Sequence, residues 1–227
     1  MESAKNVGRM VGVMLLVHLA GLIVPFILLL PIARPDFLEN AAEFSFQIKT
    51  AVFLLFLNGA LTLGIAITGW PIFRRHSERT ALWLLFFSII WFVMQAVDNV
   101  HLLAMLSLSQ RYAETGGPED LFRTLAATVS STRKWAHYTE LLIIDTWIFM
   151  LYGLFFRFAL VPRALAAFAL LTVALHTTGI TIPLFLDYGM VTLMGASMAL
   201  GHVGLAGWLM VKGFGESGIA QRNAAMW

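Results

Sequence analysis

The sequence contains no cysteine and few charged residues. Of its 227 residues, 12% are Asp, Glu, Lys or Arg, whereas a soluble domain has about a quarter. The lack of cysteine excludes structural disulfides, thiolate metal sites and iron–sulfur clusters. The shortage of charge accompanies 59% hydrophobic residues and a mean hydropathy of +0.80. Together these values predict an integral membrane protein of the all-α class, a polytopic bundle of transmembrane helices.

Motifs of several large enzyme classes are also missing. We find no P-loop, no G-x-S-x-G elbow, no zincin motif and no nucleotide-binding fold pattern. The longest polar segment is about 110–134, which is too short for a separate catalytic domain, so we expect a single transmembrane domain over 1–227. The pI near 9.2 comes from a small excess of Lys and Arg, which in a membrane protein reports topology and not nucleic-acid binding.

Six apolar runs are long enough to cross the bilayer as helices. They lie at about 11–30, 50–70, 81–107, 135–156, 164–185 and 190–211. The first run is too long for a signal-peptide core, so we expect it to be retained. Short connections separate most of the runs, including one at 71–80. The connection at 109–134 is longer, and we expect it to be a loop with a short interfacial helix that covers the site described below.

The distribution of basic residues predicts the orientation of the bundle. The 15 Lys and Arg residues divide nine to six between the two sides, and the side with nine includes the short connections. Because short cytoplasmic loops are enriched in Lys and Arg, both termini are predicted to lie in the cytoplasm. In this topology the third helix runs outward and the fourth helix returns.

The two ends of the chain resemble a known family. Arg9 and Gly12 lead directly into the first helix, and the last helix closes with the residues GWLMVKGF at 207–214. This pattern resembles a bacterial family of six-span membrane proteins catalogued as a domain of unknown function, whose members end the last helix with an aliphatic residue and Val-Lys-Gly-Phe. The resemblance implies a six-helix bundle in a bacterial inner membrane. It implies no activity and no catalytic residues.

Polar side chains interrupt the apolar run at 81–107. Gln95, Asp98, Asn99 and His101 fall within one half of the helix circumference, and Asp98 and His101 are one turn apart. A carboxylate at the centre of a bilayer costs about 2.5 to 3.5 kcal/mol on insertion scales. We therefore expect this face to meet protein or a water-filled site and not lipid.

The next helix carries a matching set of polar residues. His137 and Glu140 are one turn apart near the start of the run at 135–156. In the predicted topology they lie at the depth of Asp98 and His101, in the outer leaflet. Carboxylate-bridged metal sites in helical bundles are built from such acid and imidazole pairs on neighbouring helices. The four residues Asp98, His101, His137 and Glu140 are therefore candidate ligands of a divalent metal ion and candidate catalytic residues.

The same four residues also have a purely structural interpretation. The four residues could instead pair with each other, or with Arg133 and Lys134, and fix the register of the two helices for about 0.6 to 2 kcal/mol.

Asp145 is a fifth catalytic candidate. It lies roughly 15 Å from the start of its helix at 1.5 Å per residue, which is too deep for water at the membrane surface to hydrate the carboxylate.

Three further histidines lie on other helices. His18, His176 and His202 belong to the first, fifth and sixth apolar runs, at comparable distances from the cytoplasmic side. Because neutral imidazole is a common ligand of metals and of haem iron, these histidines are candidate ligands of a metal or of one haem. Hydrogen bonds from these imidazoles to Ser, Thr or carbonyl groups on other helices are the alternative.

Three functions are compatible with these residues. The first is a membrane-embedded enzyme or binding protein for a lipophilic small molecule, with Asp98, Glu140 and Asp145 as proton carriers or ligands. The second is a proton-coupled transporter that uses the same acids and a helix break before Pro183 as its moving part. The third is a haem or quinone-linked electron carrier built on the three deeper histidines.

Overall fold

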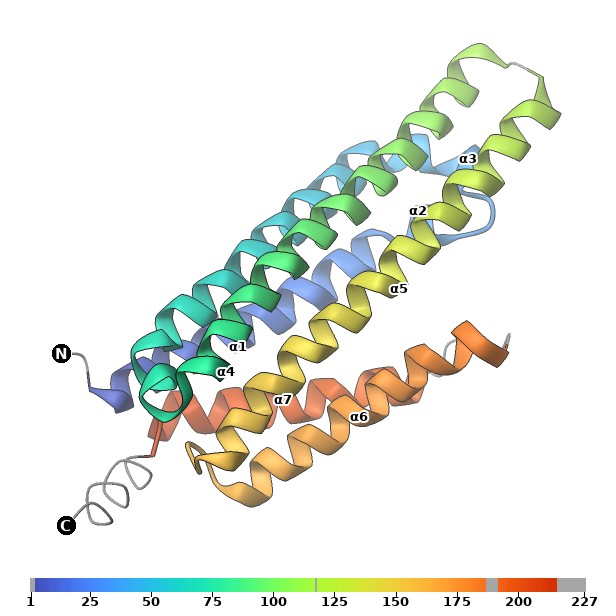
Figure 1. Ribbon diagram of the computed structural model, residues 1–227. Coiled ribbons are helices and arrows are strands. Elements are labelled where there is room, and N and C mark those ends of the chain that lie inside the picture. Colours follow the sequence, from blue (N-terminus) through green and yellow to red (C-terminus); the bar gives the residue numbers. More distant parts are fainter. Residues whose placement is uncertain (1–2, 117, 187–191, 216–227) are drawn as a thin grey trace, which may run out of the picture. The chain divides into compact units, whose positions relative to one another are not determined.

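The fold is described by a computed structural model for residues 3–116, 118–186 and 192–215. Within these residues the chain is helical and forms no strand (Figure 1). The elements in order are α1 (Ala4–Leu28), α2 (Leu30–Ala33), α3 (Phe37–Asn40), η1 (Ala41–Phe44), α4 (Ser45–Thr115), α5 (Glu119–Arg157), α6 (Arg163–Leu186) and α7 (Thr192–Lys212). In the described part, four helical segments are long and apolar enough to cross a membrane: Ala4–Leu28, Phe37–Thr115, Glu119–Arg157 and Arg163–Leu186. The prediction of an all-α membrane protein is confirmed.

Helix α4 consists of two helices that meet at one residue. Ser77 has an extended backbone with φ −160° and ψ 102°, and its Oγ accepts a hydrogen bond of 3.3 Å from the backbone N–H of Thr80. A serine in this conformation caps the N-terminus of the helix that follows it. The connection expected at 71–80 is therefore wrong in extent, because helical backbone continues on both sides of this single residue.

The long loop expected at 109–134 is also wrong. Helix α4 continues to Thr115 and ends at Gly116, whose φ of +53° is the left-handed conformation that glycine adopts readily at a helix C-terminus. Helix α5 begins at Glu119, which accepts a hydrogen bond of 2.9 Å from Arg123 one turn later. The segment is polar because its helical turns are exposed to water, and polarity alone does not distinguish exposed helix from loop.

Helix α6 passes through its proline. The helix break expected before Pro183 is not present, since the helix is continuous from Arg163 to Leu186 with Pro183 inside it. The hydroxyl of Thr181 donates a hydrogen bond of 2.6 Å to the carbonyl of Thr177, one turn earlier on the same helix. Membrane helices contain such prolines where other groups satisfy the freed backbone carbonyl.

The chain forms two compact units, each made of discontinuous segments. The first unit contains 1–19, 61–90 and 141–227, and the second contains 20–60 and 91–140. In the second unit the two ends of α4 run antiparallel and side by side. Asn99 Nδ2 donates to the Val52 carbonyl at 3.2 Å, and Gln110 Nε2 donates to Ser45 Oγ at 3.1 Å. The short helices α2, α3 and η1 bury apolar side chains in the same core.

In the first unit α1 packs closely against α7 at a glycine. A Cβ on Gly12 would lie 2.8 Å from both the Leu209 Cβ and the Met210 backbone nitrogen, so only glycine permits this approach. The end of α7 is closed by Gly213, which has a φ of +71° and donates to the Leu209 carbonyl at 2.8 Å. Phe214 follows and is buried, with its ring 5.5 Å from that of Phe155. The closing residues at 207–214 therefore end α7 and bury an aromatic ring in this unit.

Candidate functional site

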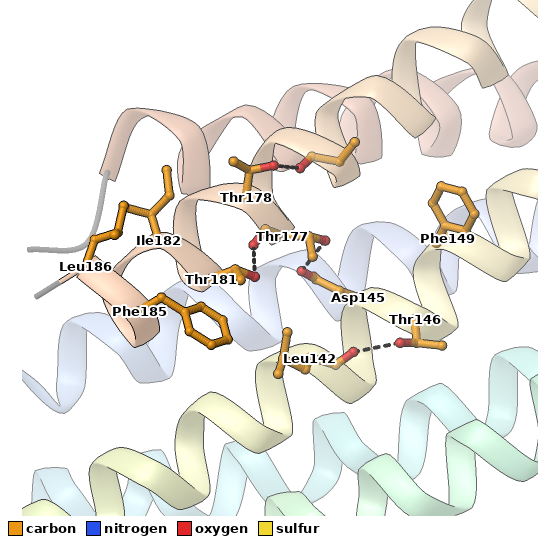
Figure 2. A pocket seen from close by; sticks show the side chains of 11 residues that line it. Leu142, Asp145, Thr146, Phe149, Thr177, Thr178, Thr181, Ile182, Phe185 and Leu186 are labelled. Carbon is orange, nitrogen blue, oxygen red and sulfur yellow. Dashed lines mark hydrogen bonds between the residues drawn. The ribbon is translucent and has the colours of Figure 1, made fainter. Parts of the chain in front are cut away.

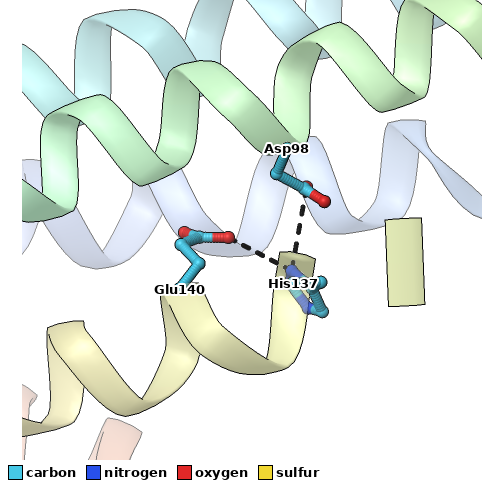
Figure 3. Close-up of side chains that lie close together, drawn as sticks. All are labelled: Asp98, His137 and Glu140. Atoms are coloured by element: carbon cyan, nitrogen blue, oxygen red, sulfur yellow. Dashed lines mark hydrogen bonds and ion pairs between the residues drawn. The ribbon is translucent and has the colours of Figure 1, made fainter. Parts of the chain in front are cut away.

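An acid and imidazole cluster lies in the second unit, where α4 meets α5. Asp98 comes from α4, and His137 and Glu140 come from α5 (Figure 3). His137 Nδ1 lies 3.2 Å from Glu140 Oε2 and 3.7 Å from Asp98 Oδ2. One possible ligand atom from each residue lies within 4.8 Å of the other two. Of the four residues expected to lie together, the structure brings together Asp98, His137 and Glu140.

The remaining carboxylate oxygens of the cluster are held by two flanking side chains. Arg133 Nε donates to Asp98 Oδ1 at 3.2 Å, and its Nη2 lies 3.5 Å from Oδ2. Trp91 Nε1 donates to Glu140 Oε1 at 3.1 Å. Outer hydrogen bonds of this kind fix the orientation of metal ligands. Glu140 Oε2 and Asp98 Oδ2 are the carboxylate oxygens that lie toward His137, and Oδ2 also accepts the hydrogen bond from Arg133 Nη2.

Burial differs within the cluster. The side chains of Asp98 and Glu140 are 1% and 5% exposed, whereas that of His137 is 35% exposed. The two carboxylates therefore lie inside the protein, and the imidazole connects them to the surface of the unit.

His101 does not join the cluster. Its Nδ1 lies 2.8 Å from the carbonyl of Val97 on its own helix, and the side chain is partly exposed. Within the described residues, the group that could hold a metal ion contains Asp98, His137 and Glu140 only. A spacing of three residues places His101 beside Asp98 on the helix surface but does not fix the direction of its side chain, so the sequence could not decide its partner.

The structure adds Trp91 to the residues of the site. Arg133 is one of the two basic partners that the structural alternative offered for the polar residues, and it pairs with Asp98. A tryptophan inside a polar-faced helix has an N–H that needs an acceptor when it is buried, and Trp91 is 0% exposed. That requirement was the available signal.

Asp145 belongs to the first unit and has its own partners. Its Oδ2 accepts a hydrogen bond of 2.9 Å from His176 Nδ1 and one of 2.8 Å from Thr177 Oγ1. Both partners come from α6, and Asp145 is 2% exposed. The sequence placed His176 with two other histidines as a cofactor ligand, whereas the structure pairs it with this acid.

The other two histidines contact each other. The rings of His18 and His202 are perpendicular, with centroids 5.6 Å apart, and both residues are buried. His202 Nδ1 lies 2.5 Å from the hydroxyl of Tyr152. Rings in direct contact leave no plane for a porphyrin between them, and the contact with Tyr152 gives His202 a hydrogen-bonding partner in place of a cofactor.

One family model matches most of the chain. The family model described as Domain of unknown function (DUF4386) matches residues 10–213. The chain belongs to this family. The resemblance drawn from the two ends of the sequence is thereby confirmed at the level of the family. No curated protein and no solved structure matches the chain. The function of this DUF4386 protein therefore has to be argued from its own side chains.

Proposed function

We propose that this DUF4386 protein binds one divalent metal ion through Asp98, His137 and Glu140. The observation that supports this most directly is the convergence of three ligand atoms within 4.8 Å. Metal–ligand bonds of about 2.0 to 2.2 Å place two atoms bound to one ion roughly 3 to 4 Å apart. The separations of 3.2 and 3.7 Å from His137 Nδ1 to the two carboxylate oxygens fall in this range.

The donor set indicates the class of metal. One imidazole and two carboxylates, in a chain without cysteine, suit zinc, manganese or iron better than copper(I), which favours sulfur ligands. The ion would replace a proton on His137 Nδ1, since a metal ligand must be deprotonated. Arg133 would remain on Asp98 and offset part of the second carboxylate charge.

Three protein ligands leave room for a fourth. Catalytic zinc sites use three side chains and keep one position for water or substrate, whereas structural sites use four. The partial exposure of His137 gives an outside molecule a route to that position. We propose that the ligand is a lipophilic small molecule, which the protein binds or converts, because a site among membrane helices is reached most readily from the bilayer.

The proposed setting is the inner membrane of a bacterium, with six spans and both termini in the cytoplasm. Four helical segments in the described residues have the length and composition of spans. The break at Ser77 and the side-by-side ends of α4 support two spans within that helix, and α7 would supply the sixth. The bias of basic residues toward one side supports the orientation.

Elemental analysis of the purified protein tests the metal proposal. Wild-type protein is purified in detergent, equilibrated with zinc or manganese, and separated from free metal. We expect about one ion per chain in the wild type and His101→Ala, and much less in Asp98→Asn and Glu140→Gln. His101→Ala is the matched control because it removes an imidazole of the same helix outside the cluster. Equal metal content in all four proteins would reject the site.

One observation favours the proton-coupled alternative. Arg133 already neutralises part of the acidic charge at Asp98, so a proton on His137 could balance the cluster without a metal. In that case His137 would carry a proton between the surface and two buried carboxylates. Proteoliposomes with an internal pH dye would then show a proton flux that Glu140→Gln abolishes, and metal-free protein would be as active as loaded protein.

A further inference from the structure

An apolar groove between α5 and α6 lies in the first unit. It has a volume of about 750 Å³, within the range of about 300 to 1,000 Å³ that small-molecule sites occupy (Figure 2). Its walls include Leu142, Phe149, Ile182 and Phe185. Among the described residues that line the groove, Asp145 is the ionisable one. The groove therefore offers an apolar wall and a single acid.

The threonines of the groove offer little to a ligand. Thr146 donates to the Leu142 carbonyl at 2.8 Å, Thr178 donates to the Ala174 carbonyl at 2.8 Å, and Thr181 donates to its own helix in the same way. Each of these hydroxyl protons is thus used by the backbone one turn earlier. The polar chemistry of the groove is concentrated on Asp145.

One oxygen of Asp145 has capacity for a further donor. Oδ2 accepts from His176 and Thr177, as described above. Oδ1 accepts no hydrogen bond from the described part of the chain, although His176 Nδ1 lies 2.9 Å from it as well. A ring nitrogen carries one hydrogen, and its geometry serves Oδ2. Oδ1 is therefore a buried acceptor in a residue that lines the groove.

We propose that this groove binds a long-chain amine that enters from the bilayer. Its ammonium group would donate to Asp145 Oδ1, and its chain would lie against the apolar wall. A cation is favoured because Asp145 is the ionisable residue among the described lining residues and no basic side chain lines the groove, while the imidazole of His176 lies behind the acid. A plain acyl chain would offer Oδ1 no additional donor, and a fatty acid would bring a second negative charge. This inference uses none of the residues of the proposed metal site.

Photoaffinity labelling of the full chain tests the proposal. The protein is placed in phosphatidylcholine nanodiscs and labelled with dodecylamine that carries a diazirine on its chain. We expect the label on peptides that contain 142–149 or 174–186. Unlabelled dodecylamine should compete at a concentration about tenfold lower than dodecanol, a difference equivalent to about 1.4 kcal/mol. Dodecanoate should compete least.

Two variants locate the binding. Asp145→Asn removes the charge and keeps the shape, and Ala174→Phe adds a large side chain to the lining at an exposed position and leaves the acid itself unchanged. We expect each to reduce labelling about tenfold. Thr128→Val, which changes an exposed α5 hydroxyl that is bound to the backbone but lies outside the groove, should label as the wild type does. Gel filtration and thermal melts confirm that each variant is folded.

The outcomes separate this proposal from the metal site. Labelling that persists in Asp98→Asn while metal is lost would show two independent sites. Unchanged labelling in both Asp145→Asn and Ala174→Phe would overturn the groove, even if one variant alone were misfolded. Equal competition by dodecylamine and dodecanol would overturn the amine, since a neutral donor would then suffice.

Discussion

Trp91→Phe tests whether the hydrogen bond to Glu140 orients a metal ligand. Trp91 is fully buried and its Nε1 donates to Glu140 Oε1 at 3.1 Å. Phenylalanine keeps a buried aromatic ring and removes the donor. Because Glu140 is 4% exposed, water cannot readily replace the lost partner. The carboxylate then keeps His137 as its neighbour but can rotate away from Asp98.

The size of the effect follows from the type of hydrogen bond. A hydrogen bond to a charged group contributes about 1.5 to 3 kcal/mol, and loss of an orienting partner lowers metal affinity by about 10- to 100-fold. We therefore expect the Kd for zinc to rise by one to two orders of magnitude on those estimates. Competition with a fluorescent zinc chelator in detergent measures this Kd. Unfolding of the metal-free protein in mixed micelles measures the loss of stability separately.

Trp135→Phe is the matched control. Trp135 lies on α5 near the same cluster in sequence but is 52% exposed. We expect its zinc Kd to equal that of the wild type. A wild-type Kd in Trp91→Phe, in a preparation in which Asp98→Asn abolishes binding, would refute the orienting role of the indole. An equal loss in both tryptophan variants would show that the effect is not specific to this hydrogen bond.

Three further predictions concern stability and topology. Arg133→Ala should destabilise the protein by about 3 to 5 kcal/mol, because it leaves Asp98 buried without its guanidinium. Arg123→Ala removes two ion pairs of a solvent-exposed arginine, with Glu39 and Glu119, and should leave the unfolding midpoint unchanged. Unfolding in mixed micelles compares the two variants. Gly12→Val should prevent α1 from packing on α7 and abolish the monodisperse gel-filtration peak, and Gly207→Ala, with open space around it, should retain that peak. A fluorescent reporter fused after residue 227 should be active and a periplasmic phosphatase fused there inactive, and the reverse result would overturn the predicted orientation.

The sequence by itself determined the class of the protein and the level at which two polar helix faces meet. Hydropathy sums the transfer free energy of each segment, which is a local property, so the membrane character follows without a fold. The high cost of exposing Asp98 and Glu140 to lipid also required a shared interior. The opening and closing residues of the chain suggested a family resemblance, and the family model that matches residues 10–213 established the membership.

Only the tertiary structure decided which partner each polar side chain has. His101 and His137 are equally spaced from an acid on their helices, yet only His137 joins the cluster. His176 pairs with Asp145 and not with a haem layer, because the rotation and register of α5 against α6 bring these two together. Rotation and register depend on the packing of side chains from distant segments. Periodicity within one helix fixes the face on which a residue lies, and contact with another helix fixes its partner.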